Sequence, residues 1–396
     1  MAASTDIVIV GGGPAGSIAA LLLARAGIHV RVFDRATFPR DKLCGDTVNP
    51  GSLALLDRLG LGAGVRAAGT PVAGMTVTGP NGAHVVADYP EGVAGVALTR
   101  RVLDQYLIES AVAAGATFDD GVNVVRPLVS DAERVTGIAV RCGPGERLVP
   151  ARVVIAADGR ASRIGGALGF SGFAPRPRRW AFGAYFEGVA GLGTRGEMHV
   201  RRDGYIGIAP LAGGVANVCV VREEKHIRGA SLARAAGDPT PPAPRQRYAD
   251  VLLSDVGRDP VLRERFRGAT QVSDVTTLGP LAVDARGAGC PGLLLAGDAA
   301  GFVDPMTGDG LRFAIRGGEL AAETALRVLE HGWTGAHAAL QDARRREFSG
   351  KWRFNRALRS LVSSPAAVAA AAAAAPFAPA VVRSIVARAG DCHRAD

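Results

Sequence analysis

Three glycines near the N-terminus have the spacing of a site that binds phosphate groups. Gly11, Gly13 and Gly16 form a G-x-G-x-x-G pattern, and Asp34 follows 18 residues after the last of them. The first glycine permits a tight turn, the second lets a pyrophosphate approach the backbone, and the third lets a helix pack closely on a strand. An acidic residue placed like Asp34 accepts hydrogen bonds from ribose hydroxyls. The pattern therefore predicts a dinucleotide site.

The elements around these glycines are those that such a site requires. Asp6–Val10 is predicted to be a buried parallel strand because most of its residues are β-branched. A helical pattern covers Pro14–Arg25, and a second strand is predicted at His29–Phe33. The start of the helix would present free N–H groups and a positive dipole end to the phosphates. A purely structural turn is the alternative, but the order strand, turn, helix, strand and acid favours a bound dinucleotide.

Two later segments repeat the order of a buried strand, small and acidic residues, and a helix. Asp158–Ser162 (DGRAS) follows predicted strands at Glu146–Val149 and Val153–Ala157. Gly297–Gly310 (GDAAGFVDPMTGDG) follows a predicted strand at Leu293–Ala296 and leads into a long helix, Asp309–Glu330. Ligands of open α/β folds bind where strand ends meet helix N-termini. Three such places imply an extended ligand; the alternative for each aspartate is a helix N-cap.

The segments GGGPAG, ADGRAS and GDAAGFVDPMTGDG resemble those of the FAD-dependent oxidoreductases that include aromatic hydroxylases, flavin halogenases and geranylgeranyl reductases. The resemblance covers about Asp6 to Arg327 and is weakest in the substrate region. Phe38–Asp46 (FPRDKLCGD) and Asp304–Gly310 (DPMTGDG) look most like the geranylgeranyl reductases. The resemblance implies an α/β fold: a Rossmann-type FAD-binding domain, glutathione reductase-2 or hydroxylase-like, with an inserted antiparallel-sheet substrate domain and C-terminal helices.

The resemblance also implies specific contacts with FAD. Ala15 and its neighbours would hold the pyrophosphate, Asp298 the ribityl hydroxyls, and the backbone at Val124 the adenine. Arg100 matches an arginine that meets the pyrophosphate and ribityl region; the alternative is a solvated charge, which the helix dipole disfavours unless an anion neutralises it. The N–H groups of Gly310 and Leu311 would stabilise the negative charge of reduced flavin. The implied FAD-binding residues are Gly11, Gly13, Pro14, Ala15, Gly16, Asp34, Arg35, Cys44, Gly45, Arg100, Val124, Asp158, Gly159, Asp298, Gly308, Gly310 and Leu311.

Two residues are candidates for catalysis. Cys44, with Gly45, would lie beside the isoalloxazine on the substrate side, as a flavin-contacting or proton-handling thiol, and Asp46 is a candidate acid. The alternative for Cys44 is a small packed side chain, the common fate of a free cysteine.

One strand departs from the reductase pattern Y-x-W-x-F-P, in which aromatic side chains contact a prenyl chain. Tyr205 and Pro210 remain in this sequence, whereas Gly207 and Ala209 replace the two bulky residues. The four residues are predicted to lie on the substrate side. The two small ones imply a reshaped or more open pocket.

The predicted elements divide the chain into three regions. Helices are predicted at Pro50–Leu59, with Asn49 as its N-cap, and at about Arg100–Ala114. From Arg179 to Arg222, strands follow one another without helices and indicate an antiparallel sheet separate from the parallel one. These strands are predicted at Trp180–Gly188, Gly196–Arg201, Tyr205–Pro210 and Val215–Val221. We therefore assign residues 1–70, 98–170 and 270–330 to the FAD-binding domain, residues 71–97 and 171–269 to the substrate-side domain, and residues 331–396 to a C-terminal helical region.

Composition narrows the class of protein further. The 396 residues include 48% hydrophobic ones and carry a net charge of +9, but the basic residues form no single block, which argues against nucleic-acid binding. The five cysteines show no C-x-x-C spacing, so no metal site or disulfide framework is predicted. The chain shows no signal-peptide pattern, and we expect a reducing, cytoplasmic location.

The C-terminal region has two interpretations. The apolar run Ala366–Val382, interrupted by Pro376 and Pro379, is predicted to be a packed or interfacial helix rather than a membrane-spanning one. Basic and aromatic residues cluster before it, as expected either of a packed amphipathic helix or of peripheral membrane contact. The cluster contains Arg344, Arg345, Arg346, Phe348, Lys351, Trp352, Arg353, Phe354, Arg356, Leu358 and Arg359.

We expect an FAD-dependent oxidoreductase similar to geranylgeranyl reductases, which reduces C=C bonds of a hydrophobic isoprenoid or natural-product substrate with hydride from reduced flavin N5. The alternatives are an FAD-dependent monooxygenase that hydroxylates or epoxidises a natural-product intermediate, and a non-redox prenyl-binding protein on the same fold. No second G-x-G-x-x-G leads from a predicted strand into a predicted helix. Electrons would therefore come from transiently bound NAD(P)H or from a protein such as ferredoxin. The sequence does not indicate an oligomeric state.

Overall fold

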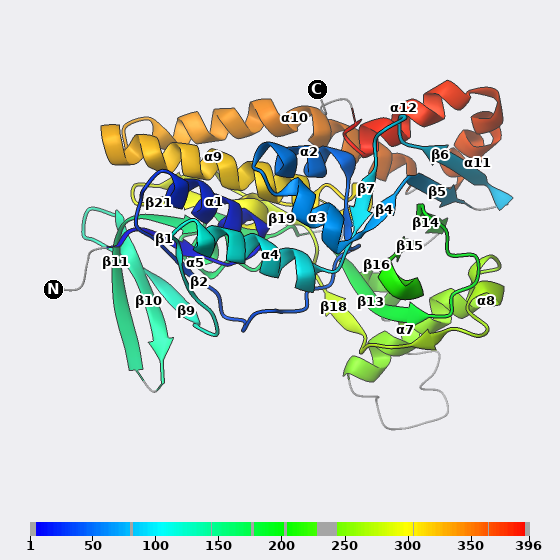
Figure 1. Cartoon of the computed structure of the whole chain (residues 1–396), viewed down its shortest axis with the longest axis horizontal. Helices are drawn as coiled ribbons and strands as arrows, with labels where there is room; N and C mark the ends of the chain where they lie inside the picture. The colour runs from blue at the N-terminus through cyan, green and yellow to red at the C-terminus, as the bar shows by residue number, and fades with distance from the viewer. Residues whose placement is uncertain are drawn as a thin grey trace.

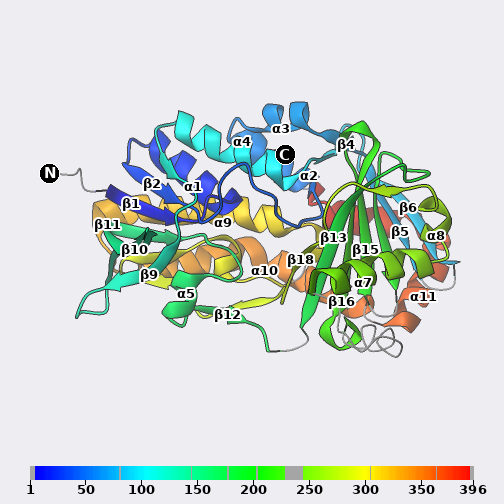
Figure 2. The same cartoon turned by 90° about the horizontal axis from the view of Figure 1, so that it is seen from below.

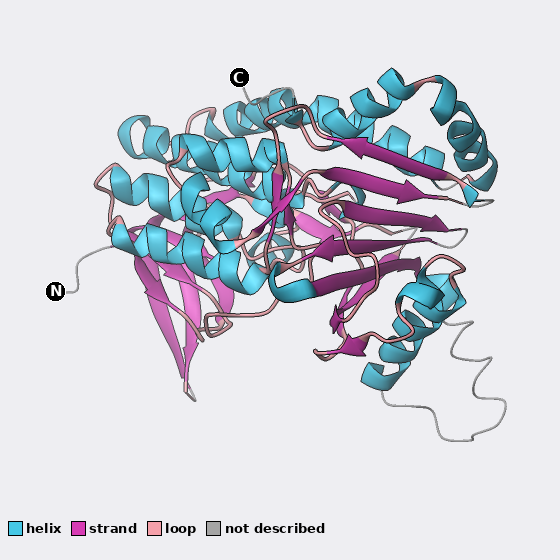
Figure 3. Ribbon diagram, turned by 45° about the vertical axis from the view of Figure 1, so that its right-hand side comes forward, coloured by secondary structure: helices cyan, strands magenta, loops and turns pink. Residues whose placement is uncertain are grey.

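The computed structural model describes residues 5–79, 82–143, 145–175, 178–201, 204–227, 244–303, 305–362 and 364–392. Two large β-sheets organise these residues, and helices cover both (Figures 1 and 2). Figure 3 shows strands of the second sheet lying between the C-terminal helices and a separate helical layer.

A parallel sheet carries the glycine-rich loop. Its parallel strands run in the order β21, β11, β1, β2 and β8. Ile7, Val8 and Ile9 of β1 are fully buried, because helices α1, α4 and α9 pack on one face of the sheet and strands β9 and β10 with α5 on the other. The bounds are β1 Thr5–Val10, α1 Pro14–Arg25, β2 Val30–Phe33, α4 Arg100–Ala113, β8 Thr117–Asp119, β9 Val124–Val129, β10 Val135–Cys142, β11 Gly145–Ala156, α5 Arg163–Ala167, β21 Leu293–Leu295 and α9 Gly310–His331.

The helices of this region begin where the sequence predicts. Helix α1 has the predicted bounds, and α4 begins at Arg100 as expected. Helix α2 (Pro50–Arg58) begins after Asn49, whose side chain accepts a hydrogen bond from the Ser52 N–H at 2.9 Å. Capping and periodicity were therefore sufficient to locate these elements.

Strand β11 differs from the prediction, which placed two strands at Glu146–Val149 and Val153–Ala157. The structure joins them into one strand. Its first half pairs with β10 as far as Pro150, and from Ala151 onward it pairs with β1. The strand exchanges its partner at the proline instead of ending there.

The second sheet is antiparallel except at one pair. Its strands run in the order β17, β13, β16, β15, β14, β5 and β6, and β14 and β5 are parallel. Helices α7 and α8 pack on one of its faces. The bounds are β5 Gly74–Thr78, β6 His84–Asp88, β13 Arg179–Glu187, β14 Gly196–Arg201, β15 Gly204–Pro210, β16 Val215–Glu223, α7 Pro244–Arg258, α8 Leu262–Arg265, β17 Thr270–Gln271 and β18 Thr276–Leu278, which pairs with β13.

Smaller elements connect these layers. They are β3 Thr47–Val48, α2 Pro50–Arg58, α3 Gly62–Ala68, β4 Thr70–Val72, β7 Gly95–Ala97, β12 Ser171–Phe173, η2 Ala212–Gly214, β19 Val283–Ala285, β20 Gly289–Cys290, η4 Gly297–Ala300 and η5 Pro305–Thr307. Strands β5 and β6, from the predicted region 71–97, pair in one sheet with β13–β16. The domain boundaries themselves stay a prediction.

The C-terminal region is helical, as expected, but broken. Helix α10 (Ala336–Val362) packs on α9, and α11 (Pro365–Ala374), η6 (Ala375–Phe377) and α12 (Pro379–Ala389) follow it beside β5 and β6 (Figure 1). In α10, Phe348 and Lys351 are buried, so the basic and aromatic cluster is in part a packed helix face. Within the described ranges no single helix is long and apolar enough to cross a membrane; α10 and α11, bent by 100°, pass that test only as a pair, by length and composition.

Candidate active site

The loop between β1 and α1 has the geometry of a phosphate site. Gly11 has φ +104°, and a Cβ atom there would lie 2.4 Å from the Ala157 carbonyl oxygen. A Cβ at Gly16 would lie 1.9 Å from the Gly11 carbonyl oxygen, so helix and strand approach too closely for any side chain. Helix α1 begins after Gly13 without a side-chain cap. The N–H groups of its first turn therefore remain available to an anionic ligand.

The acidic residue after β2 holds this loop in place. The Asp34 carboxylate accepts hydrogen bonds from the backbone N–H groups of Gly12 (2.8 Å) and Ala36 (2.9 Å). These contacts fix the turn, and the contact of Asp34 with a ribose stays a prediction.

The segment after Phe38 brings Cys44 next to two charged residues, Arg100 and Asp46. Arg100 forms two hydrogen bonds with Asp104, at 2.7 and 2.8 Å, and both side chains are buried. Asp104 supplies the anion that a cation at the start of a helix needs. Burial raises the pKa of the Cys44 thiol, although the nearby Arg100 charge opposes the rise. Cys44 therefore retains its proton at neutral pH.

Asp46 lies behind Cys44, in contact with the second sheet. Its carboxylate is 1% exposed and accepts hydrogen bonds from the Tyr185 hydroxyl (2.7 Å) and from Asn217 Nδ2 (2.6 Å). The same Asn217 nitrogen donates to the Cys44 carbonyl oxygen at 3.0 Å. Burial raises the pKa of Asp46 to about 6, although the bonds from Tyr185 and Asn217 and the charge of Arg100 hold it down. Asp46 is not among the described residues that line the cavity described below.

The second predicted segment combines capping with an unpaired atom. Asp158 Oδ2 accepts hydrogen bonds from the backbone N–H groups of Arg163 (2.7 Å) and Ile164 (3.4 Å) in the first turn of α5, while the N-cap itself is Ser162. Its other oxygen, Oδ1, is buried with no hydrogen-bond partner among the described residues. The neighbouring Gly159 lines the cavity.

The third segment presents a second uncapped helix start. Helix α9 begins after Asp309 without a side-chain cap, since the fully buried Asp309 carboxylate is turned toward Lys351 Nζ (3.1 Å) and Asn355 Nδ2 (2.9 Å). Lys351 Nζ also donates to the carbonyl oxygens of Arg388 (2.6 Å) and Ala389 (2.9 Å), at the end of α12. The start of α9 is thus tied to the last helix of the chain. Asp304 lies outside the described residues.

One cavity of about 460 Å³ joins these segments. Its polar end is lined by the uncapped starts of α1 and α9 and by residues of the segments that contain Cys44 and Gly159. Its other end is apolar. The polar lining includes Gly13, Pro14, Ala15, Cys44, Gly45, Arg100, Gly159, Asp298, Gly308, Gly310 and Leu311. Two free helix N-termini facing one cavity fit a ligand with a pyrophosphate at one place and a ring that gains negative charge at another, as FAD has.

The apolar end was only partly foreseen. Tyr205, Gly207 and Ala209 line it, whereas Pro210 ends β15 opposite Ala216. Side chains from β5, β6, β14 and the C-terminal helices were not predicted to line the cavity, because contacts between segments so distant in the chain leave no local pattern. They include Met75, Val77, Val85, Met198, Val200, Leu358, Leu361, Val362, Val368, Val382, Ile385 and Val386.

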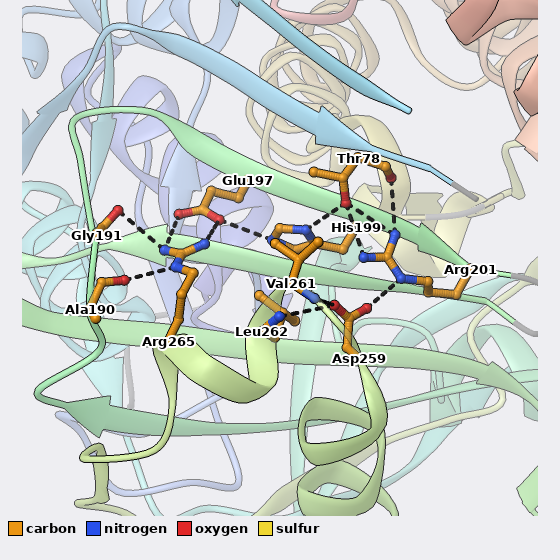
Figure 4. A network of polar contacts seen from close by, with 10 residues as sticks. All are labelled: Thr78, Ala190, Gly191, Glu197, His199, Arg201, Asp259, Val261, Leu262 and Arg265. Carbon is orange, nitrogen blue, oxygen red and sulfur yellow. Dashed lines mark hydrogen bonds and ion pairs between the residues drawn. The ribbon is translucent and has the colours of Figure 1, made fainter. Parts of the chain in front are cut away.

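A buried polar network holds strand β14 against α8 (Figure 4). Met198 and Val200 line the cavity, and the side chains of Glu197, His199 and Arg201 point into the network (Figure 4). Arg265 donates to both carboxylate oxygens of Glu197, at 2.5 and 2.8 Å. Burial alone would raise the pKa of Glu197, but the bonds from Arg265 and His199 outweigh it and lower the pKa to about 2. The other members of the network are Thr78, Arg201 and Asp259.

The remaining predicted residues lie away from the cavity lining. Arg35 is exposed. Val124 is the first residue of β9 and is buried in the core on the face of the parallel sheet that β9, β10 and α5 cover. Their proposed contacts with the adenine end of FAD stay predictions.

Comparison with known proteins adds a family to this geometry. Residues 4–346 match the family model described as an FAD binding domain. The chain is 31% identical over 347 residues to the menaquinone reductase of Mycobacterium tuberculosis, covering 81% of this chain and 76% of that protein. It is 33% identical over 340 residues to digeranylgeranylglycerophospholipid reductase 2 of Methanopyrus kandleri, covering 84% of this chain and 79% of that protein.

Solved structures agree on the fold. A geranylgeranyl bacteriochlorophyll reductase-like protein from Thermoplasma acidophilum superposes with a TM-score of 0.78 at 22% identity, over 92% of this chain and 89% of that one. The myxobacterial chondrochloren halogenase CndH, an FAD-dependent halogenase, superposes with a TM-score of 0.79 at 23% identity, over 96% of this chain and 90% of that one. Since reductases and halogenases share the architecture, the fold alone does not choose between their reactions.

Proposed function

The chain belongs to the FAD binding domain family and is an FAD-dependent oxidoreductase, and we propose that it reduces C=C bonds of an isoprenoid-like substrate. The observation that carries the proposal is the continuous cavity, which joins the residues suited to FAD with a long apolar end. A polyprenyl chain is apolar along its length and has double bonds at regular intervals. Such a substrate would place one double bond at the flavin while its tail occupies the apolar end.

The names of the relatives support the same substrate class. Menaquinone reductase and digeranylgeranylglycerophospholipid reductase are named for quinone and lipid substrates, and each matches over more than three quarters of its own length. Gly207 and Ala209 leave space in the wall where the reductase pattern has bulky residues. We therefore expect a substrate with a bulkier group or a different chain path at this position.

Bound FAD, once reduced, would supply the hydride; the chain must supply a proton and hold the substrate. Cys44 lines the cavity and retains its proton, so its Sγ–H is the proposed proton donor to the substrate carbon. The thiolate left behind would be stabilised by the Arg100 guanidinium until it is protonated again from solvent. Asp46, joined to the Cys44 backbone through Asn217, is the proposed positioning residue for this loop.

The electron donor belongs to this proposal too. Among the described residues, Gly11–Gly16 is the one G-x-G-x-x-G that leads from a strand into a helix, and the net charge of +9 favours encounter with an acidic redox protein such as a ferredoxin. Transiently bound NAD(P)H is the alternative. Measuring flavin reduction by NADH, NADPH and reduced ferredoxin separately would distinguish these donors.

The free thiols of Cys44, Cys219, Cys290 and Cys392 support a reducing location such as the cytoplasm.

An anaerobic experiment tests the proposal. Enzyme whose FAD has been reduced with dithionite is mixed without oxygen with short isoprenoid alkenes, and flavin absorbance is followed. We expect substrate-dependent reoxidation, slower in Cys44→Ala and unchanged in Cys290→Ala, whose thiol lies outside the cavity lining. No reoxidation with any isoprenoid, together with rapid substrate-dependent reoxidation in air, would instead favour the monooxygenase.

A further inference from the structure

The apolar end of the cavity opens between the last helices of the chain. Leu361 of α10, Ala371 of α11 and Ile385 of α12 all line the cavity. All three are also exposed, Leu361 by 39% and Ile385 by 43%. A residue that lines a cavity and also contacts solvent lies at its mouth. The cavity therefore reaches the surface at the end of the molecule formed by α11 and α12 (Figure 1).

The surface around this mouth is apolar. Phe377 of η6 is 89% exposed, the highest value among the exposed large hydrophobic residues, and Val381 of α12 is 57% exposed. The sequence carries no charged residue from Ser360 to Val382. Pro376 and Pro379 break the helices on either side of Phe377, so the ring projects from a corner between them. Isolated exposed apolar residues need no explanation, but a group around a cavity mouth indicates a binding surface.

The part of the sequence that forms this surface carries charges of one sign. From Phe348 to Gly390 the sequence contains no aspartate or glutamate. The same stretch contains Lys351, Arg353, Arg356, Arg359, Arg383 and Arg388. Lys351 is buried, whereas Arg353, Arg356, Arg383 and Arg388 are exposed. Arg383 lies between the exposed Val381 and Ile385 in the sequence of α12. An apolar surface whose own segment carries only cations is complementary to an anionic bilayer, which offers acyl chains below a layer of negative headgroups.

We propose that the surface of α11, η6 and α12, defined by Phe377, Val381, Ile385 and Arg383, lies on an anionic lipid bilayer, so that a lipid enters the cavity mouth directly from the membrane. Phe377 and Val381 enter the boundary between headgroups and acyl chains, and Arg383 contacts the headgroups. The contact is peripheral, made by helix faces and one corner. It uses a different surface from the predicted basic and aromatic cluster of α10, whose Phe348 and Lys351 are packed inside the protein.

The entry route rests on the proposed function, but the membrane contact does not. Binding to vesicles is measured without substrate, whereas reoxidation of reduced FAD by a short, water-soluble isoprenoid is measured without vesicles. Vesicle binding without isoprenoid reduction would overturn the substrate class alone. Reduction without vesicle binding would overturn the membrane contact alone.

The test is co-sedimentation of the FAD-bound protein with vesicles of phosphatidylcholine alone and with one third phosphatidylglycerol. We expect binding to the anionic vesicles that falls steeply when the salt concentration is raised. Phe377→Asp should weaken vesicle binding about tenfold or more, because an aromatic ring that inserts into the bilayer is replaced by an anion. Arg383→Glu should weaken it about fivefold or more, since each basic residue contributes at a charged surface.

Matched controls are available at the opposite end of the molecule. Leu148 of β11 is 58% exposed, almost the same as Val381, so Val381→Asp should weaken vesicle binding whereas Leu148→Asp should not. Arg147→Glu makes the same change of net charge on exposed β11 and should have little effect compared with Arg383→Glu. Retained FAD absorbance and circular dichroism identify variants that still fold.

Equal losses in the α12 variants and in their controls would overturn the proposal, because binding would then follow net charge or hydrophobicity alone. Equal binding to both vesicle types would also overturn it. A dimer that Phe377→Asp converts to a monomer, without vesicle binding by the parent protein, would assign the surface to a second copy of the chain.

Discussion

Replacing Asp46 by asparagine should change stability in a way that depends on pH. The Asp46 carboxyl is 1% exposed and accepts hydrogen bonds from Tyr185 and Asn217, and burial raises its pKa to about 6. In the unfolded chain its pKa returns to about 3.8. The folded protein therefore binds this proton more tightly. The stabilisation of the folded protein by protonated Asp46 is fully present below about pH 4 and is lost as the pH rises through about 6.

The two pKa values set the size of the effect. At pH 8 Asp46 is ionised in both states, and a difference of roughly two pKa units lowers the free energy of unfolding by roughly 3 kcal/mol. At pH 4.5 the same difference lowers it by about 1 kcal/mol. An asparagine side chain would avoid that cost but lose about one hydrogen bond, worth about 1 kcal/mol, because its NH₂ group cannot accept. Asp46→Asn should therefore match the parent near pH 4.5 and be roughly 2 kcal/mol more stable at pH 8.

Urea denaturation followed by far-UV circular dichroism, at fixed FAD concentration, measures this difference. Asp131→Asn, in the exposed turn between β9 and β10, serves as the control and should leave the pH dependence unchanged. A difference between Asp46→Asn and the parent that stays constant from pH 4.5 to 8 would refute the reasoning, since the carboxyl would then have the same pKa in both states.

Three other sites test close contacts in the structure. Gly16→Ala should abolish FAD binding and destabilise the protein by about 1–3 kcal/mol or more, because its Cβ would lie 1.9 Å from a backbone oxygen. Gly257→Ala is the control, since a Cβ there meets open space, and it should leave FAD binding intact. FAD fluorescence titration measures binding to both variants. Lys351→Met should cost about 3–5 kcal/mol in denaturation experiments by leaving Asp309 buried without a cation, and Lys351→Met with Asp309→Asn should cost less than the sum of the two single changes. Gly207→Leu should raise KM for long isoprenoids about tenfold while FAD affinity is retained. The nearest atom to a Cβ at Gly207 would be 3.9 Å away, so the leucine fits without a backbone clash and its side chain occupies space in the cavity. Equal KM values for long and short chains would contradict that placement.

The features near the glycine-rich loop were predictable because they are local. A close-packed turn needs Gly11 and Gly16, helix α1 follows the periodicity of Pro14–Arg25, and Asn49 is a common N-cap. Each depends on neighbours within a few residues. The same kind of information predicted the four strands of the second sheet between Arg179 and Arg222.

The substrate end of the site depends on contacts that no local pattern contains. Asp46 meets Tyr185 and Asn217, which are 139 and 171 residues away in the chain. Lys351 was predicted only as one member of the basic and aromatic cluster, and its burial between Asp309 and the end of α12 appears only in the fold. The Ala-rich run was predicted as a packed or interfacial helix, and its contribution to the cavity wall appears only when α11 lies beside β5 and β6.

Identifying the product of one anaerobic turnover tests the central claim most directly. Reduced, FAD-bound enzyme is mixed with a defined isoprenoid alkene without oxygen, and the product is analysed by mass spectrometry. We expect a product that has gained two hydrogen atoms, formed in proportion to the flavin reoxidised. An unchanged alkene under these conditions, with a product that gains one oxygen atom only after air is admitted, would contradict the reductase and identify an oxygenase.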